Sequence, residues 1–153
     1  MRFTIAVSAL FAAVLAAPAP QTSDCPNPAH CGSAPDPSTY ENVDITGLYI
    51  RKNNGIQNAG FKLTGDNATD LACEIGPVAE LPSEVVTCGD SKYRFGLTKG
   101  ESSEFGLAVY HETGLASGKY LIGDVPTYCR AGGNGPDDFV CNQVGDYLTF
   151  VLV

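Results

Sequence analysis

The chain has no tryptophan, one methionine, two histidines, and only nine lysine and arginine residues against 17 aspartate and glutamate residues. The net charge of −8 and the lack of a basic stripe argue against nucleic acid as a partner, because phosphate backbones repel such a surface. No apolar segment approaches the roughly 20 residues that a membrane-spanning helix needs. We therefore expect neither a nucleic-acid partner nor a membrane span.

The usual catalytic and metal-binding motifs are also absent. There is no C-x-x-C pair, and only His30 and His111 could complete a zinc site, so we expect no metal and no cofactor. His111 ends an expected strand beside Glu112, where we expect a solvated side chain, and there is no G-x-S-x-G motif. We assign no catalytic residue. The many carboxylates keep a small extracellular hydrolase, or an inhibitor of hydrolases, as an alternative.

The first 17 residues have the pattern of an export signal. Arg2 supplies a positive charge, residues 3–13 an apolar stretch, and residues 14–17 the small side chains that precede a cleavage site. Residues 18–42 hold most of the ten prolines and few bulky apolar side chains, so we expect an irregular arm. Residues 43–153 then form the folded domain of a secreted protein.

Short apolar segments separated by Gly, Asn, Asp and Pro are typical of an all-β domain. In KYRFGL and FGLAVYH every second side chain is apolar, which predicts strands that are buried on one face. DYLTFVLV is apolar on both faces, which predicts a strand buried on both sides. Turn residues at 53–55, 65–67 and 98–101 predict hairpins.

The resulting fold prediction is a single compact antiparallel β-barrel, or a barrel-like sandwich, held by disulfides. A barrel interior can also enclose a small apolar molecule, so a ligand carrier is a further alternative. The expected strands are Ile45–Arg51, Gly60–Thr64, Leu71–Cys73, Val85–Cys88, Lys92–Leu97, Phe105–His111, Lys119–Val125, Phe139–Asn142 and Tyr147–Val153.

All six cysteines follow the expected signal, and an even number in an exported chain favours disulfides. Six cysteines allow 15 pairings in principle. Pairing of neighbours is favoured, because each couple flanks a turn-like segment. The expected bridges are Cys25–Cys31, Cys73–Cys88 and Cys129–Cys141.

The segment TYCRAGGNGPDDFVC at 127–141 reads as two strand ends joined by a flexible tip and tied by a disulfide. Closing a loop of this size contributes about 3 kcal/mol by restricting the unfolded chain. Asp137 and Asp138 are adjacent turn residues, so they do not form a catalytic carboxylate pair. A clamped hairpin loses little freedom when it docks onto a partner. The candidate partner-binding residues are Arg130, Asn134, Asp137 and Asp138.

One modification motif is present. Asn67-Ala68-Thr69 is a glycosylation sequon on an expected hairpin tip. Asn67 is therefore a candidate glycosylation site.

The run YCRAGGNGPDDFVC at 128–141 resembles the cysteine-bounded segment of the Alternaria major-allergen family. This family comprises small secreted fungal proteins, including elicitors and effectors of plant defence. LYIRK at 48–52, GFKL at 60–63, LACE at 71–74 and TCG at 87–89 resemble the family in the same order.

The resemblance implies a compact β-barrel with the bridges Cys73–Cys88 and Cys129–Cys141. It also implies a non-enzymatic role in the plant apoplast. The implied partner is a host protein of the thaumatin-like pathogenesis-related class, with triggered or modulated immunity, cell death and allergenicity as consequences.

Dimers that bind small phenolic ligands are a further implication of the resemblance. The allergen joins two subunits through one cysteine of its arm, whereas this chain has Cys25 and Cys31 there. If these two pair with each other, no thiol is left for a covalent homodimer.

Overall fold

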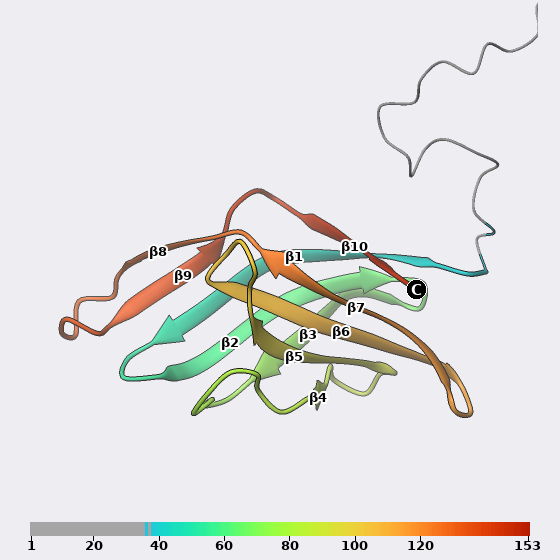
Figure 1. The fold of residues 1–153 in the computed structure, drawn as a ribbon, viewed down its shortest axis with the longest axis horizontal. Coiled ribbons are helices and arrows are strands. Elements are labelled where there is room, and N and C mark those ends of the chain that lie inside the picture. Colours follow the sequence, from blue (N-terminus) through green and yellow to red (C-terminus); the bar gives the residue numbers. More distant parts are fainter. Residues whose placement is uncertain (1–35, 37) are drawn as a thin grey trace, which may run out of the picture. The chain divides into compact units, whose positions relative to one another are not determined.

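The computed structural model describes residues 36 and 38–153, which form ten β-strands and no helix (Figure 1). No described segment could therefore cross a membrane as a helix. Every strand expected from the sequence overlaps an observed one. The strands are β1 (Glu41–Lys52), β2 (Ile56–Gly65), β3 (Ala68–Ile75), β4 (Val86–Thr87), β5 (Tyr93–Lys99), β6 (Phe105–Gly114), β7 (Ser117–Val125), β8 (Thr127–Ala131), β9 (Phe139–Gln143) and β10 (Leu148–Leu152).

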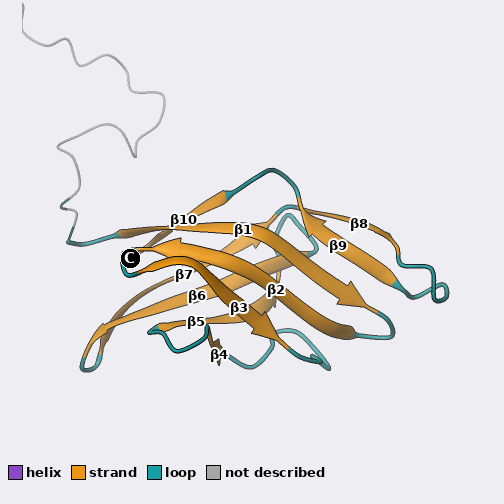
Figure 2. Ribbon diagram, turned by 180° about the vertical axis from the view of Figure 1, so that it is seen from behind, coloured by secondary structure: helices purple, strands orange, loops and turns teal. Residues whose placement is uncertain are grey.

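The strands form two antiparallel sheets (Figure 2). The six-stranded sheet has the order β3-β2-β1-β9-β8, with β10 also paired to β1, and the four-stranded sheet has the order β4-β5-β6-β7. The expectation of an all-β fold is confirmed. Two architectures were predicted for it: the closed barrel is wrong, and the barrel-like sandwich of two sheets is correct.

Incomplete pairing at the sheet edges explains why the barrel does not close. At one edge Val153, just after β10, exchanges backbone hydrogen bonds of 3.0 and 3.3 Å with Tyr120 of β7. At the other edge closure would require β3 to pair with β4, but β4 has only two residues and pairs with β5 alone among the described strands. The Cys73–Cys88 disulfide joins these two edges instead.

The core lies between the two sheets and follows the alternation of the sequence. Tyr93, Phe95 and Leu97 of β5 point inward, as predicted, and are almost completely buried. Phe61 from the six-stranded sheet meets Phe95 edge-to-face, with ring centroids 4.8 Å apart. Burial of apolar side chains on both inner faces is thus the main force that holds the layers together.

The last strand differs from its prediction. Phe150 and Leu152 of β10 are buried, but Val151 and Val153 are 46% and 67% exposed. The prediction of burial on both sides is therefore wrong, because among the described residues no third layer covers the outer face of the six-stranded sheet.

The first strand changes partners along its length. β1 pairs with β10 over residues 41–45 and with β9 over residues 49–52, and Gly47 between them has a φ of +63°. In this gap the Gln143 side chain replaces a neighbouring strand. It accepts a hydrogen bond of 3.1 Å from the Leu48 amide and donates one of 3.1 Å to the Ile45 carbonyl. Both β9 and β10 therefore pair with β1, one on each side of this gap.

The two local disulfides of the folded part are present, as Cys73–Cys88 and Cys129–Cys141. The first links the two sheets, and the second links the adjacent strands β8 and β9. The expected signal at 1–17, most of the expected arm at 18–42 and the expected Cys25–Cys31 bridge lie outside the described residues. β1 begins at Glu41, so the last two residues of the expected arm are part of the sheet.

Candidate functional site

The cysteine-bounded segment forms a regular hairpin. β8 and β9 pair directly, with Cys129 opposite Cys141 and Arg130 opposite Val140. The disulfide joins two residues that are 12 positions apart in the sequence and closes the base of the tip. Both the ladder and the covalent bond therefore restrict the tip, as the sequence predicted.

An ion pair between a buried carboxylate and a partly exposed guanidinium organises the tip. The Asp138 carboxylate is fully buried and accepts hydrogen bonds of 3.2 and 3.1 Å from the Arg51 guanidinium of β1. It also accepts a bond of 2.9 Å from the Asn134 amide. Gly132 packs so closely against this carboxylate that a Cβ atom there would collide with it. Asp138 thus fixes the path of residues 132–138.

The outer side of this hairpin carries tyrosine and arginine side chains in two rows across the strands. Tyr128 and Tyr49 both lie opposite Asn142, and Arg130 and Arg51 both lie opposite Val140. Tyr128 is 70% exposed, although it stands in a regular strand. We call this surface the hairpin face, and it consists of Tyr49, Arg51, Tyr128, Arg130, Val140 and Asn142.

The four candidate partner-binding residues fall into two groups. Arg130, Asn134 and Asp137 are exposed on or beside the hairpin face, where a partner can reach them. Asp138 is buried beneath the tip by its contacts with Arg51. Its position suits it to shaping the surface rather than to touching a partner.

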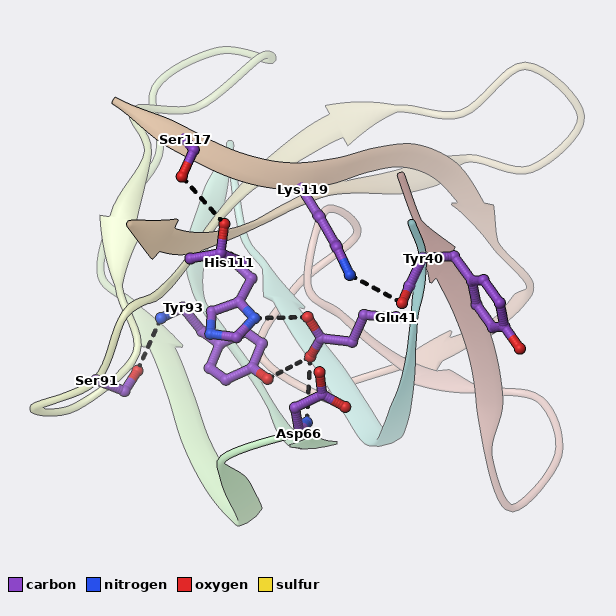
Figure 3. A network of polar contacts seen from close by, with 9 residues as sticks. Tyr40, Glu41, Asp66, Ser91, Tyr93, His111, Ser117 and Lys119 are labelled. Carbon is purple, nitrogen blue, oxygen red and sulfur yellow. Dashed lines mark hydrogen bonds and ion pairs between the residues drawn. The ribbon is translucent and has the colours of Figure 1, made fainter. Parts of the chain in front are cut away.

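A second polar cluster lies at one end of the core, where both sheets meet (Figure 3). The buried Glu41 carboxylate of β1 accepts a hydrogen bond from the Tyr93 hydroxyl of β5 and lies 2.5 Å from His111 Nδ1 of β6. The Asp66 amide of the β2–β3 turn donates a further bond of 3.2 Å to Glu41. The rings of Tyr93 and His111 stack, with centroids 4.0 Å apart. We call Glu41, Tyr93 and His111 the core triad.

The Glu41 carboxylate of the core triad has three internal partners. Burial alone would raise the pKa of Glu41, but the hydrogen bonds from Tyr93, His111 and the Asp66 amide lower it overall. Burial and the adjacent Glu41 carboxylate raise the pKa of Tyr93. The triad therefore consists of an ionised carboxylate held by donors, which is suited to joining the sheets.

The expectation of a solvated His111 is wrong. The side chain is buried and points inward with Val109, two residues before it on β6. Glu41 was missed because it falls in the segment that was expected to be an irregular arm. Alternation carried one step beyond Val43 would have placed Glu41 on the buried face, and one step beyond Val109 would have done the same for His111.

One group of metal-type ligands occurs among the described residues, formed by Glu104, Cys129 and Cys141. Both sulfurs belong to the disulfide and so are not thiolate ligands. Glu104 forms an ion pair with Lys52 instead. The group is therefore a packing contact of the hairpin base.

The sequon is accessible for modification. Asn67 is exposed in the short turn between β2 and β3. β3 and β8 are at the two ends of the strand order β3-β2-β1-β9-β8. The β2–β3 turn and the β8–β9 hairpin therefore lie toward opposite edges of the six-stranded sheet.

Comparison with known proteins identifies related sequences. A family model described as Alternaria alternata allergen 1 matches residues 45–141. The chain is 49% identical to effector protein PevD1 of Verticillium dahliae over 147 residues, which cover 94% of this chain and 88% of that protein. It is 33% identical to the major allergen Alt a 1 of Alternaria alternata over an alignment of 162 positions, which covers 100% of this chain and 98% of the allergen.

Solved structures agree with the fold. A crystal structure of the Alternaria alternata allergen Alt a 1 matches with a TM-score of 0.57 and 28% identity, over 71% of this chain and 88% of that chain. A second crystal structure of this major allergen gives a TM-score of 0.54 over 94% of its chain. The fold of this chain is thus similar to that of the allergen.

Proposed function

The chain belongs to the Alternaria alternata allergen 1 family, and we propose that it is a secreted effector that binds a plant extracellular protein through the hairpin face. The family contains allergens and effectors and is generally non-enzymatic. The two disulfides fit an oxidising compartment such as the apoplast. The partner class that we propose is the thaumatin-like pathogenesis-related proteins, with altered plant immunity as the result.

One observation carries the choice of surface. Tyrosine and arginine are the side chains that dominate binding energy at protein interfaces, and the hairpin face presents two of each. The disulfide and the Arg51–Asp138 ion pair hold the surface in place before a partner arrives. Binding then costs little conformational entropy.

The free edge of β8 adds a second mode of contact. Gly132 and Pro126 are hydrogen-bonded across the hairpin to Asp138 and Val144, which sets the alternation of the ladder between them. Residues 127, 129 and 131 therefore direct their backbone N–H and C=O groups away from β9. Among the described strands β8 pairs only with β9, so an extended segment of the partner can add to this edge.

Capture from plant apoplastic fluid tests the proposal. The purified protein should retain a thaumatin-like protein, identified by mass spectrometry. Tyr128→Ala and Arg130→Ala should each reduce retention at least tenfold, in line with the loss of an interface anchor. Lys62→Ala, an exposed cation on β2 of the same sheet, is the matched control and should bind normally.

Two results would count against the proposal. If the wild-type protein retains no plant protein and gives no defence response after infiltration into leaves, the effector role is wrong. If retention is normal in both hairpin-face variants, the effector role can hold but the surface is wrong.

We also propose that Asn67 carries an N-linked glycan. The exposed turn meets the access requirement, and its place across the sheet from β8 leaves the hairpin face uncovered. Protein secreted from a fungal host should lose mass after treatment with a peptide N-glycosidase. Asn67→Gln protein should show no such change.

A further inference from the structure

A shallow groove lies at the β6–β7 end of the four-stranded sheet. Its volume is about 690 Å³, which is within the usual range for small-ligand sites of about 300–1,000 Å³. Its lining includes Arg94, Tyr110, Glu112 and Tyr120, which alternate with the buried residues of β5, β6 and β7 and so face outward. The groove is therefore on the opposite sheet from the hairpin face.

Two aromatic rings form one wall of the groove. Tyr110 and Tyr120 are direct cross-strand partners, and their rings stack with an interplanar angle of 15° and centroids 6.0 Å apart. Tyr120 remains 54% exposed. An exposed, nearly flat aromatic surface suits the C–H groups of a sugar ring, because their partial positive charge faces the negative π-cloud.

The charge of the groove is opposite to that of the chain. Lys92, Arg94 and Lys119 line it, although the whole chain has only nine lysine and arginine residues. Glu112 is the one acidic residue in the lining, and its carboxylate lies 2.6 Å from the Arg94 guanidinium. Lys119 lies opposite the inward-facing His111, and its ammonium donates a bond of 2.9 Å to the Tyr40 carbonyl, so Lys92 and Arg94 are the cations available to a ligand. The groove thus concentrates positive charge on an acidic protein.

We propose that this groove binds an acidic oligosaccharide. A sugar ring stacks on Tyr120, and the carboxylates of the uronic acid units pair with Lys92 and Arg94. An open groove suits a chain molecule that continues beyond the site, whereas a single small molecule is better retained in an enclosed cavity. The local excess of cations selects the charged polymer over neutral glycans.

Titration with trigalacturonate, followed by calorimetry and by amide chemical shifts, tests the proposal. The expected result is saturable binding with shifts at residues 92–94 and 110–120. Cellotriose, a neutral trisaccharide of similar size, should bind at least tenfold more weakly. Benzoate, which offers a carboxylate on an aromatic ring, should also bind at least tenfold more weakly.

Variants of the groove give effects of opposite sign. Arg94→Gln and Tyr120→Ala should each weaken trigalacturonate binding about tenfold. Glu112→Gln should strengthen it severalfold, because the substitution removes the competing carboxylate and frees Arg94. Lys62→Gln, on the other sheet, should bind like the wild type. Each variant changes an exposed side chain, and circular dichroism checks that it is folded.

Absence of trigalacturonate binding to the folded wild-type protein would overturn the proposal. Equal binding of cellotriose would overturn the role of charge, and stronger binding of benzoate would overturn the ligand class. Unchanged affinity in both Arg94→Gln and Glu112→Gln would overturn the location. None of these outcomes depends on the host-protein partner of the hairpin face.

Discussion

Within residues 38–153, two acidic side chains are fully buried, and they hold different regions together. Glu41 lies at the end of the core and bonds to β5, β6 and the β2–β3 turn. Asp138 lies beneath the hairpin tip and bonds to Arg51, whose side chain is 37% exposed, and to the tip backbone. The first carboxylate joins the two sheets, whereas the second orders a single loop.

The difference shows how the same chemical group can serve stability in one region and surface shape in another. Loss of the Glu41 contacts removes a link on which both sheets depend. Loss of the Asp138 contacts leaves both sheets intact, because β8 and β9 remain paired and disulfide-linked. We therefore expect the core triad to control unfolding and the tip ion pair to control recognition.

The largest effect is expected for Glu41→Gln. The amide cannot accept hydrogen bonds from Tyr93, His111 and the Asp66 amide as a carboxylate does, so buried donors lose their partner. Breaking a buried charged network in this way should lower the free energy of unfolding by about 3 kcal/mol. Urea unfolding of the wild type and the variant measures this difference in the free energy of unfolding.

Glu74→Gln, an exposed position on β3, is the matched control for Glu41→Gln and should change stability by less than about 0.5 kcal/mol. Equal effects of the two substitutions would show that the core triad does not hold the sheets together.

Protonation of Glu41 should make the stability of the core triad depend on pH. The pKa of Glu41 in the folded protein is below its ordinary value of 4.5, so its stabilising contribution is complete above about pH 4.5. As the pH falls further, the unfolded chain takes up a proton first, and the contribution is lost as the pH passes through the folded-state pKa. Denaturant midpoints of the wild type should therefore drop steeply below pH 4.5, and Glu41→Gln should show a shallower dependence. Parallel curves for the two proteins would contradict this assignment.

An intermediate effect is expected for Asp138→Asn. The substitution removes the ion pair between the buried Asp138 carboxylate and the Arg51 guanidinium. Because the Arg51 side chain is partly exposed and water can still solvate its charge, the free energy of unfolding should fall by only about 1–2 kcal/mol. Hydrogen exchange should quicken at Asn134, whose amide bonds to Asp138, while the amides of β5 and β6 keep their protection. Partner retention should fall although Asp138 is buried. Accelerated exchange throughout the core would instead mean that this carboxylate is as central as Glu41.

The sequence was sufficient for the strands and for the two disulfides of the described part, because both depend on short-range patterns. Alternation in KYRFGL identified the inward-facing residues of β5, and the tip of the hairpin could be recognised from its glycines between Cys129 and Cys141. The contacts of the buried carboxylates could not be predicted in this way. Glu41 and His111 are 70 residues apart, and Arg51 and Asp138 are 87 apart, so only the packing of whole strands brings them together.

The sandwich-like arrangement was equally hard to distinguish from a barrel. The two differ in whether β3 pairs with β4, and the sequence of β4 carries no alternation long enough to decide this. The groove residues were each visible in the sequence, but their grouping depends on the register of β6 with β7.

The smallest effects concern the backbone of two hairpin tips and test whether Asp138 holds its loop in one conformation. Gly133 has a φ of +96° with open space around its Cα, so Gly133→Ala tests backbone strain alone and should cost about 1 kcal/mol. Ala116, in the β6–β7 turn, has a φ of +56°, and Ala116→Gly should stabilise the protein by about 0.5 kcal/mol because glycine relieves that strain.

If Asp138 fixes the tip, the cost of Gly133→Ala should shrink in an Asp138→Asn background, where the loop can relax, while the gain from Ala116→Gly should stay the same. A double-mutant cycle by urea unfolding measures both, and strict additivity at Gly133 would mean that the tip keeps its shape without the buried carboxylate.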